Sequence, residues 1–231
     1  MARKATEKPR RGETAPRRRT ASKGGARRPR GDIPGRVIAA ALDLAAGEGW
    51  RTVSMAAIAA GAGLTLAQVH GAFPSKAAIV EGFFRRIDAQ VLAGGEGDED
   101  AGDAARDRLF DVLMRRFDAL NPHKAAVAAI IRDSVADPPA LMAGAPRFLH
   151  SMAWMVEAAG LSSAGLAGAV RTEGLALVYL NALRVWLADD TEDMEKTMAA
   201  LDWGLRQAEM LMRLCGFGAP PGAGEDTPAG G

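Results

Sequence analysis

Residues 36–87 read RVIAAALDLAAGEGWRTVSMAAIAAGAGLTLAQVHGAFPSKAAIVEGFFRRI, and this stretch decides the fold. Apolar residues recur at helical spacing from Val37 to Ala45, with Pro34 just inside the start of the run and Gly49 just past its end. Proline is favoured in the first turn of a helix, and glycine is favoured directly after the last turn. The pattern therefore predicts a first helix that ends before Gly49.

Two short helices are expected next. Ser54 can cap a helix over MAAIAAGAG (55–63), whose glycines close it. Thr65 and Gln68 then have the spacing of a capping box, in which the hydroxyl accepts one free backbone N–H and the amide side chain accepts another. A third helix is therefore expected to begin at Leu66.

The third helix is expected to end at the phrase Phe73-Pro74-Ser75-Lys76, because proline cannot continue it and Ser75 can cap a fourth helix. A helix, a short turn containing glycine and a second helix have the spacing of a helix-turn-helix, whose second helix lies in the major groove of DNA. The pattern thus gives these candidate DNA contacts: Arg51, Thr52, Thr65, Leu66, Gln68, His70 and Lys76.

The expected groove-binding helix carries little charge, because residues 62–75 contain no Lys or Arg. Gln68 can pair with an adenine through two hydrogen bonds, Thr65 can meet a phosphate or a thymine methyl, and His70 can donate to a phosphate. A simpler interpretation stays open for each residue. In that interpretation Thr65 and Gln68 serve only as caps, His70 is exposed without a partner, and Lys76 is solvated.

Three phrases resemble the amino-terminal domain of the tetracycline-repressor (TetR) family of transcriptional regulators: ALDLAAGEGW (41–50), SMAAIAAGAGLT (54–65) and FPSKAAIV (73–80). The resemblance implies an all-helical homodimer with a helix-turn-helix head and a variable ligand pocket and dimer face behind it. It further implies that residues 65–73 form the recognition helix. The chain departs from the family pattern at two positions, since the family usually has a long polar residue near Leu66 and an aromatic hydroxyl at His70.

A second resemblance supports a rival function. Residues Leu180–Leu205, LNALRVWLADDTEDMEKTMAALDWGL, are similar to the carboxy-terminal part of ubiquinone-biosynthesis accessory proteins. Those proteins share the regulator fold but bind a lipid and a partner hydroxylase rather than DNA. The missing positive charge in residues 62–75 fits this alternative, whereas the phrase Phe73–Lys76 and the basic amino-terminal arm described next fit the regulator.

Charge is strongly segregated along the chain. Residues 1–31 hold 12 Lys and Arg against 2 Glu, while the remaining 200 residues hold 17 basic and 26 acidic ones, so that net charges of about +10 and −9 underlie the overall +1. The first segment has no apolar periodicity, and we expect a disordered arm. Such an arm can track DNA phosphates or enter the minor groove. The alternatives are a nonspecific basic extension and a mitochondrial-type presequence, which would need an amphipathic stripe that is missing here.

Composition predicts the class of protein. Twelve prolines that stand mostly at segment ends, and few alternating β-branched runs, indicate an all-α fold of about nine helices. The single Cys215 cannot form an intramolecular disulfide, and the chain has no long uncharged apolar run and no signal-peptide pattern, so we expect a cytoplasmic protein without membrane insertion. No catalytic, phosphate-binding or metal-binding motif occurs, so we expect no enzyme, cofactor or metal.

The rest of the chain divides at changes in composition. We expect an arm over residues 1–31, a helix-turn-helix domain with its connecting helix over 32–92, a helical ligand-binding and dimerisation domain over 103–215, and a flexible tail over 216–231. The phrase GGEGDEDAG (94–102) is the acidic linker between the two domains. The predicted architecture is therefore a three-helix DNA-binding head followed by a helical bundle.

Within the bundle, three local signals set the expected helix boundaries. Asn121 followed by Pro122 is expected to cap a helix that runs through Val135. Pro146 is expected to interrupt or kink the helix that follows. Asp190 is expected to open the last helix, with acidic residues in its first turn.

The bundle also carries the candidates for ligand binding and dimerisation. Soft and aromatic side chains gather in it and could line an apolar cavity for a small apolar effector, although ordinary core packing is the open alternative: Phe110, Met114, Phe117, Trp154, Tyr179 and Trp186. The resemblance implies that the last two long helices pair with their copies in a four-helix bundle. Such a dimer would place two recognition helices on half-sites about 34 Å apart, on a pseudo-palindromic DNA operator. The alternative is that these helices only complete the core of one chain.

Overall fold

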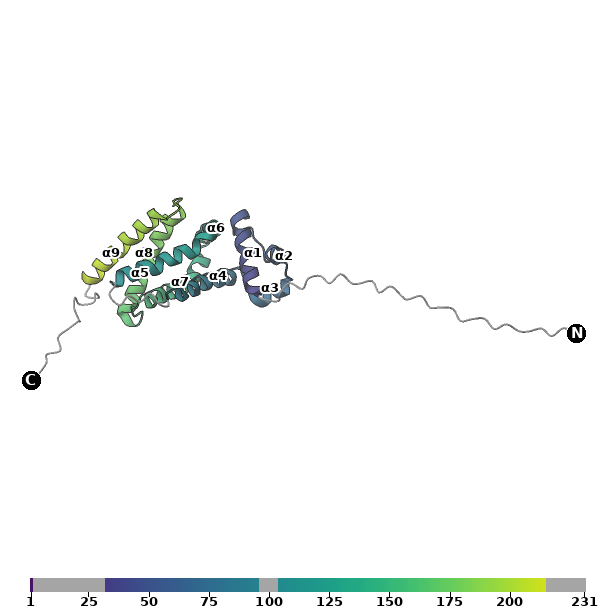
Figure 1. Ribbon diagram of the computed structural model, residues 1–231, viewed down its shortest axis with the longest axis horizontal. Helices are drawn as coiled ribbons and strands as arrows, with labels where there is room; N and C mark the ends of the chain where they lie inside the picture. The colour runs from purple at the N-terminus through teal and green to yellow at the C-terminus, as the bar shows by residue number, and fades with distance from the viewer. Residues whose placement is uncertain (2–31, 96–103, 215–231) are drawn as a thin grey trace, which may run out of the picture. The chain divides into compact units, whose positions relative to one another are not determined.

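The computed structural model of the chain describes residues 1, 32–95 and 104–214. All regular elements in these ranges are helical, which confirms the expected all-α class. The described residues form nine α-helices and one 3₁₀ turn, and the α-helices are labelled in Figure 1: α1 (Ile33–Glu48), α2 (Met55–Ala62), α3 (Leu66–Ala72), α4 (Lys76–Ala93), α5 (Ala105–Leu120), η1 (Asn121–His123), α6 (Lys124–Val135), α7 (Pro138–Ala158), α8 (Gly165–Leu187) and α9 (Glu195–Leu214). The predicted arm, most of the acidic linker and the predicted tail lie outside the described residues.

Helices α1, α2 and α3 form the expected head, and local capping sets their ends. The N–H of Gly49, whose φ is 83°, bonds to the Ala45 carbonyl where α1 ends. The Ser54 hydroxyl accepts a hydrogen bond from the Ala57 nitrogen at 3.0 Å and so begins α2. Thr65 caps α3 in the predicted capping box. These three predicted boundaries are confirmed. They could be predicted because each depends on residues that are close in sequence.

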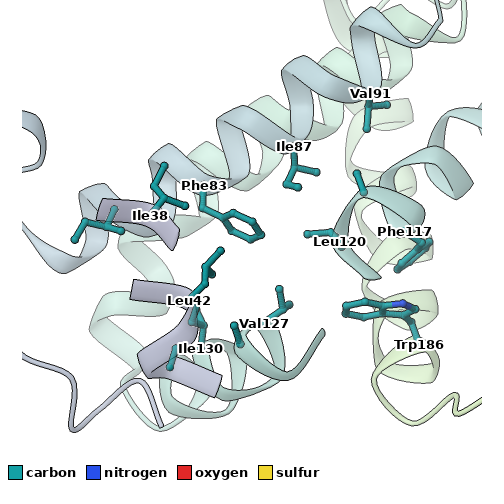
Figure 2. Close-up of a cluster of buried hydrophobic side chains, with 14 of the residues drawn as sticks. Ile38, Leu42, Phe83, Ile87, Val91, Phe117, Leu120, Val127, Ile130 and Trp186 are labelled. Atoms are coloured by element: carbon teal, nitrogen blue, oxygen red, sulfur yellow. The ribbon is translucent and has the colours of Figure 1, made fainter. Parts of the chain in front are cut away.

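Helix α4 begins at Lys76 under the predicted Ser75 cap, whose hydroxyl accepts from the Ala78 nitrogen at 3.1 Å. Figure 2 shows the continuous cluster of buried side chains to which α4 contributes Phe83, Ile87 and Val91, together with residues of α1, α5, α6 and α8. One face of α4 is therefore buried against both the head and the remaining helices.

The head is also held directly by α6. Helix α1 packs against α6 as well as against α2, α3 and α4. Ile38 and Leu42 of α1 and Val127 and Ile130 of α6 are all buried in this contact region (Figure 2). Burying an aliphatic side chain of this size contributes about 1.5–3 kcal/mol, so the head and α6 are firmly attached.

The connection from α5 to α6 differs from the prediction. Asn121 does not cap α6, because residues 121–123 form a 3₁₀ turn and α6 begins at Lys124 without a side-chain cap. The N–H of Asn121 bonds to the carbonyls of Phe117 and Asp118, so the helical path of α5 continues into the turn. Pro122 is compatible with this arrangement because its fixed φ also suits the first turn of a 3₁₀ helix.

Pro146 does not interrupt the following helix. α7 runs without a break from Pro138 to Ala158 and contains Pro146 in its interior. Proline cannot donate to the carbonyl four residues earlier, which here belongs to Met142. Met142 and Pro146 are both exposed, so water can satisfy the carbonyl that the helix leaves free.

The start of α9 also differs from the prediction. α9 begins at Glu195, so Asp190 precedes it by a loop and does not cap it. The neighbouring Asp189 has that role, since its Oδ2 accepts from the Thr197 nitrogen at 2.9 Å and its Oδ1 accepts from the Thr191 hydroxyl at 2.5 Å. Burial alone would raise the pKa of Asp189, but the hydrogen bonds from Thr191 and Thr197 outweigh it and lower the pKa well below the ordinary range.

No single helix in the described ranges is long and apolar enough to cross a membrane. Helices α2 and α3 reach the required length and apolarity only as a pair, and a bend of 103° separates them. Both helices contribute buried side chains to the head, namely Ile58 and Ala59 from α2 and Val69 from α3.

Candidate nucleic-acid interface

The turn between α2 and α3 is fixed from both sides. Gly63 has a left-handed backbone with φ of 61°, a conformation that favours glycine, and its N–H bonds to the carbonyls of Ala59 and Ala60. The Arg36 guanidinium on α1 donates to the carbonyls of Ala62 and Gly63. Arg36 was not among the candidate residues predicted from the sequence. It lies in the first turn of α1, which places its side chain within reach of the turn between α2 and α3. The guanidinium therefore holds the turn against α1.

The capping box of α3 uses the polar atoms that the sequence offered for DNA reading. Gln68 Oε1 accepts from the Thr65 backbone nitrogen at 2.9 Å and from the Thr65 hydroxyl at 3.2 Å. Thr65 Oγ1 in turn accepts from the Gln68 backbone nitrogen at 3.2 Å. The Gln68 oxygen is thus occupied inside the helix end, whereas a two-bond pairing with adenine requires that oxygen to be free.

The remaining surface of α3 is exposed and uncharged. Val69 is fully buried and points into the head, while the rest of the first two turns face outward. Leu66 is 54% exposed, and a side chain added at Gly71 would meet no atom within 4 Å. The structure therefore brings these sequence candidates together on one short helix: Thr65, Leu66, Gln68 and His70.

Helix α3 is attached to α4 by a close aromatic contact. Phe73 is buried, and its ring lies so near Gly82 of α4 that a Cβ at Gly82 would be 2.5 Å from Phe73 Cε1. Any larger residue at position 82 would push the ring away, because this distance is far below van der Waals contact. The end of the exposed helix is therefore fixed to the helix that leads to the rest of the fold.

Lys76 turns toward the head. Its Nζ donates to the Trp50 carbonyl oxygen at 2.5 Å and lies 4.5 Å from the centre of the Trp50 ring. Partial burial lowers the pKa of Lys76, and the nearby Asp133 carboxylate offsets part of this effect. The ammonium group that was predicted to contact DNA is engaged with the loop after α1 instead.

Arg51 and Thr52 lie in that same loop and are both exposed. The Arg51 backbone nitrogen donates to Asp133 Oδ2 of α6 at 2.5 Å. The Thr52 hydroxyl donates to the carbonyls of Glu48 and Gly49, both at 2.9 Å. The Arg51 guanidinium makes no hydrogen bond or ion pair with the described residues, so it remains available to a phosphate.

A second link joins the start of α1 to α4. Asp32 caps α1 through Gly35, at 2.9 Å, and pairs with the Arg86 guanidinium at 2.6 Å. The hydrogen bond from Arg86 lowers the pKa of Asp32 below its ordinary value. Both partners are about half exposed, so the pair orients the helices more than it stabilises them.

The residues predicted to line a ligand pocket divide into two groups. Phe117, Tyr179 and Trp186 pack together in the core, with ring centres 5.2 Å apart for Phe117 and Tyr179 and 5.8 Å apart for Phe117 and Trp186. Phe110 and Met114 are partly buried against the same core. Trp154 is 48% exposed on α7, where its Nε1 donates to His150 Nε2 at 3.1 Å.

One polar atom in this aromatic cluster has no partner. The Trp186 Nε1 is buried and makes no hydrogen bond with the described residues. A buried N–H of this kind is costly unless something accepts from it. The Lys124 ammonium lies 5.5 Å from the centre of the Trp186 ring and donates to the Asp189 carbonyl.

A buried ion pair joins four helices of the body, and sequence reasoning missed it. Arg116 of α5 is 2% exposed and pairs with Asp88 of α4, and its Nε donates to the Tyr179 hydroxyl at 3.2 Å. The Ser151 hydroxyl of α7 donates to Asp88 Oδ1 at 3.0 Å. Burial disfavours the charged guanidinium, but Tyr179 and Asp88 outweigh it and raise the pKa of Arg116. The sequence contained one indication of this buried arginine: Arg116 follows Leu113 by three residues, which places both on the same apolar face of α5.

An open hollow of about 430 Å³ lies between α5 and α9. Its wall combines carboxylates with apolar side chains: Asp107, Phe110, Asp111, Met198, Ala199 and Asp202. Phe110, one of the predicted pocket residues, therefore borders this hollow.

The two last helices leave apolar side chains in contact with solvent. α8 and α9 pack along each other (Figure 1). Their outer sides expose large apolar residues: Leu166, Leu177 and Leu180 on α8, and Trp203, Met210, Leu211 and Leu214 on α9. Charged residues border them on both helices: Glu173, Arg184, Lys196, Arg206 and Arg213. We call the seven exposed apolar residues, together with the charged residues that border them, the α8–α9 face.

Comparison with known families agrees with the geometry of the head. Residues 37–82 match the family model described as bacterial regulatory proteins, tetR family. The match covers most of α1, all of α2 and α3 and the first part of α4, so it confirms the resemblance that the three sequence phrases carry. A comparison with curated proteins found no match.

Solved structures are similar over a larger part of the chain. A TetR transcriptional regulator from Nitrosomonas europaea ATCC 19718 has 22% identity and a TM-score of 0.65, covering 76% of this chain and 97% of its own. A TetR transcriptional regulator from Rhodococcus sp. RHA1 has 20% identity and a TM-score of 0.54, covering 75% and 93%. A tetR-family regulator from Streptomyces coelicolor has 18% identity and a TM-score of 0.51, covering 79% and 83%. At these identities the likeness establishes the fold.

Proposed function

We propose that the chain is a DNA-binding transcriptional regulator, because residues 37–82 match the family model described as bacterial regulatory proteins, tetR family. The observation that carries the proposal is the α2–turn–α3 unit, in which α3 is capped, fixed to α4 and exposed along its outer side. In finer terms we propose a cytoplasmic, non-enzymatic, ligand-responsive repressor that binds a pseudo-palindromic operator as a homodimer.

The operator contacts follow from what the head exposes. Leu66, Gln68 and His70 enter the major groove, with the Thr65 end of α3 nearest the bases. Arg51 binds a phosphate beside the groove, and Lys76 supports the Arg51 loop through Trp50. The arm of residues 1–31 supplies the positive charge that α3 lacks, and each phosphate that it neutralises changes the salt slope of binding by about −0.9.

We propose that the α8–α9 face pairs with the same face of a second copy. The exposed residues Leu177 and Leu180 lie on α8, and Trp203 and Met210 lie on α9. A twofold contact would bury all of them in a four-helix bundle formed by α8 and α9 of the two copies. Glu173 and Lys196 on this border can meet opposite charges across the twofold axis, whereas Arg206 and Arg213 already pair with Asp202 and Glu209 of the same helix. Pairing of this kind would give two copies of α3 a fixed separation.

The effector is proposed to enter the aromatic cluster of α5 and α8. A small apolar molecule that carries one acceptor, such as a carbonyl oxygen, would satisfy the unpartnered Trp186 Nε1. It would have to displace the stacked rings of Phe117 and Tyr179. Because this cluster contacts α4 through Arg116 and Asp88, displacement would change how α4 holds the head.

The proposal is tested by titrating the full chain against DNA fragments that flank its own gene, at moderate salt and with excess competitor DNA. We expect retarded complexes and a footprint on an inverted repeat. Binding that is no stronger for these fragments than for competitor DNA would contradict the regulator. If the purified protein instead carries an isoprenoid, as native mass spectrometry would detect, the lipid-binding accessory role would replace it.

A further inference from the structure

The amide of Gln68 has a defined orientation. Both the Thr65 N–H and the Thr65 hydroxyl point at one atom of this amide, at 2.9 and 3.2 Å. That atom must be the oxygen, because the Thr65 N–H can only donate and an amide nitrogen there would face it with a second donor. The capping box therefore decides which end of the Gln68 amide faces the helix and which faces outward.

The outward end is the amide nitrogen. Gln68 is exposed, and its Nε2 makes no hydrogen bond with the residues that the structure describes. The neighbouring positions on the outer side, Leu66 and Ala67, offer only apolar groups. At this point of its surface α3 thus presents two N–H donors and no acceptor.

From this geometry we infer that Gln68 reads the operator as a hydrogen-bond donor only. Adenine presents N7 as an acceptor and its N6 amino group as a donor in the major groove, whereas guanine presents N7 and O6 as acceptors. A donor alone fits N7 of either purine. Thymine O4 is an acceptor too. Gln68 therefore disfavours cytosine, whose major-groove edge offers only a donor, but does not give adenine the preference over guanine that a two-bond pairing would give, and the operator half-site is degenerate at the base that Gln68 contacts.

The capping box maintains this specificity, so Thr65 acts as a positioning residue. Turning the amide to accept from adenine N6 would remove Oε1 from the Thr65 N–H and hydroxyl. The first turn of α3 would then lose the half of its capping box that Gln68 supplies, while the Gln68 backbone N–H would stay bonded to Thr65 Oγ1. This inference rests on the proposed function, because it concerns how α3 reads a base and has no meaning for a chain that does not bind DNA.

The test uses the full chain and operator duplexes with altered bases, with dissociation constants measured by fluorescence anisotropy. The position read by Gln68 is the one at which Gln68→Ala removes discrimination. There we expect adenine and guanine duplexes to bind within about 3-fold of each other. Replacing adenine by 7-deazaadenine, which lacks N7, should weaken binding about 5-fold or more, and replacing it by purine, which lacks the amino group, should have no effect.

Two variants separate reading from folding. Gln68→Glu keeps a side-chain oxygen for the Thr65 N–H but has no donor, so it should lose the 7-deaza effect while α3 remains capped. Thr65→Ser keeps both hydrogen bonds of the capping box, so the 7-deaza effect should persist in it. Ala143→Ser, at an exposed residue of α7, is the control that should bind all duplexes as the wild type does. Circular dichroism and thermal unfolding check that each variant is folded.

The outcomes distinguish this inference from the proposed function. A preference for adenine over guanine of about 5-fold or more, lost when the amino group is removed, overturns donor-only reading and leaves the regulator intact. Gln68→Ala without effect at every position also overturns it. Absence of sequence-specific binding by the wild type overturns both.

Discussion

Asp133 of α6 accepts a hydrogen bond from the backbone nitrogen of Arg51, with 2.5 Å between N and Oδ2. The same carboxylate acts on the charge of Lys76, whose ammonium bonds to the Trp50 carbonyl. One side chain of the body therefore supports the loop that precedes α2 and the first residue of α4. A displacement of α6 would reach the head at this point.

Replacing Asp133 by Ala should destabilise the head. Arg51 N–H loses its acceptor and Lys76 loses a nearby negative charge, so we expect the free energy of unfolding to fall by about 1–2 kcal/mol. Urea unfolding measures the loss. Asp133→Asn, which keeps an acceptor, should lose less. Asp118→Ala, at an exposed carboxylate of α5, is the control and should stay within about 0.5 kcal/mol. Equal losses for the Asp133 and Asp118 variants would show that the contact with Arg51 contributes nothing.

The buried pair of Asp88 and Arg116 predicts a strongly non-additive result. Asp88→Leu leaves the nearly inaccessible guanidinium without its carboxylate, and we expect a loss of about 3–5 kcal/mol. Changing both residues, as Asp88→Leu with Arg116→Met, should recover most of that loss because no buried charge remains. A double-mutant cycle by urea unfolding gives the coupling energy. Losses that simply add would contradict a direct pair.

Asp189 predicts a pH dependence of stability. Its folded pKa is depressed, so its contribution is complete above the unfolded pKa near 3.8 and is lost as the pH falls from there toward the lower folded pKa. At pH 7 Asp189→Asn should be less stable than the wild type by about 1–3 kcal/mol, because one oxygen becomes a donor facing Thr191 or Thr197.

Urea unfolding of both proteins at several pH values checks this. The difference between wild type and Asp189→Asn should be constant from pH 8 to pH 5 and should shrink below about pH 4. A difference that grows as the pH falls would mean that the Asp189 pKa is raised in the folded state.

Helix boundaries that local contacts determine could be predicted from the sequence, and a boundary that depends on a more distant contact could not. The caps at Ser54, Thr65 and Ser75 could be read from the sequence because each involves atoms three residues apart. The start of α9 was misplaced because Asp189 and Asp190 carry the same local signal. Only the approach of Thr197 and Thr191 to Asp189 decides between them.

The candidate site shows the same limit. The exposed side of α3 could be predicted from the helical period of its sequence. The orientation of the Gln68 amide could not, because the same residue is suited both to cap the helix and to pair with a base, and only the structure shows that its oxygen is used in the cap. A lysine at position 76 is chemically suited to contact a phosphate, but its ammonium group donates to the carbonyl of Trp50, which lies 26 residues earlier in the chain. Asp88 and Arg116 are 28 residues apart, and no local pattern connects them.

The proposed dimer predicts a change of mass when charge is placed in the centre of the α8–α9 face. Leu177, which is 71% exposed in one chain, should be buried by the partner copy, so Leu177→Arg should convert a dimer to a monomer. Size-exclusion chromatography with light scattering measures the mass. Leu141→Arg, at an exposed residue of α7, is the matched control and should remain dimeric. A wild-type chain that is already monomeric would refute the dimer.

The placement of α3 in the major groove is tested most directly by cleaving DNA from α3 itself. In a Cys215→Ser chain, which has no other cysteine, Ala67→Cys introduces a single thiol on the exposed side of α3 that can carry an iron chelate. The account predicts strand cleavage centred on two operator positions about 10 base pairs apart, while the same label at Ala143→Cys of α7 cleaves neither. Diffuse cleavage from position 67, or cleavage no different from that of the α7 label, would contradict it.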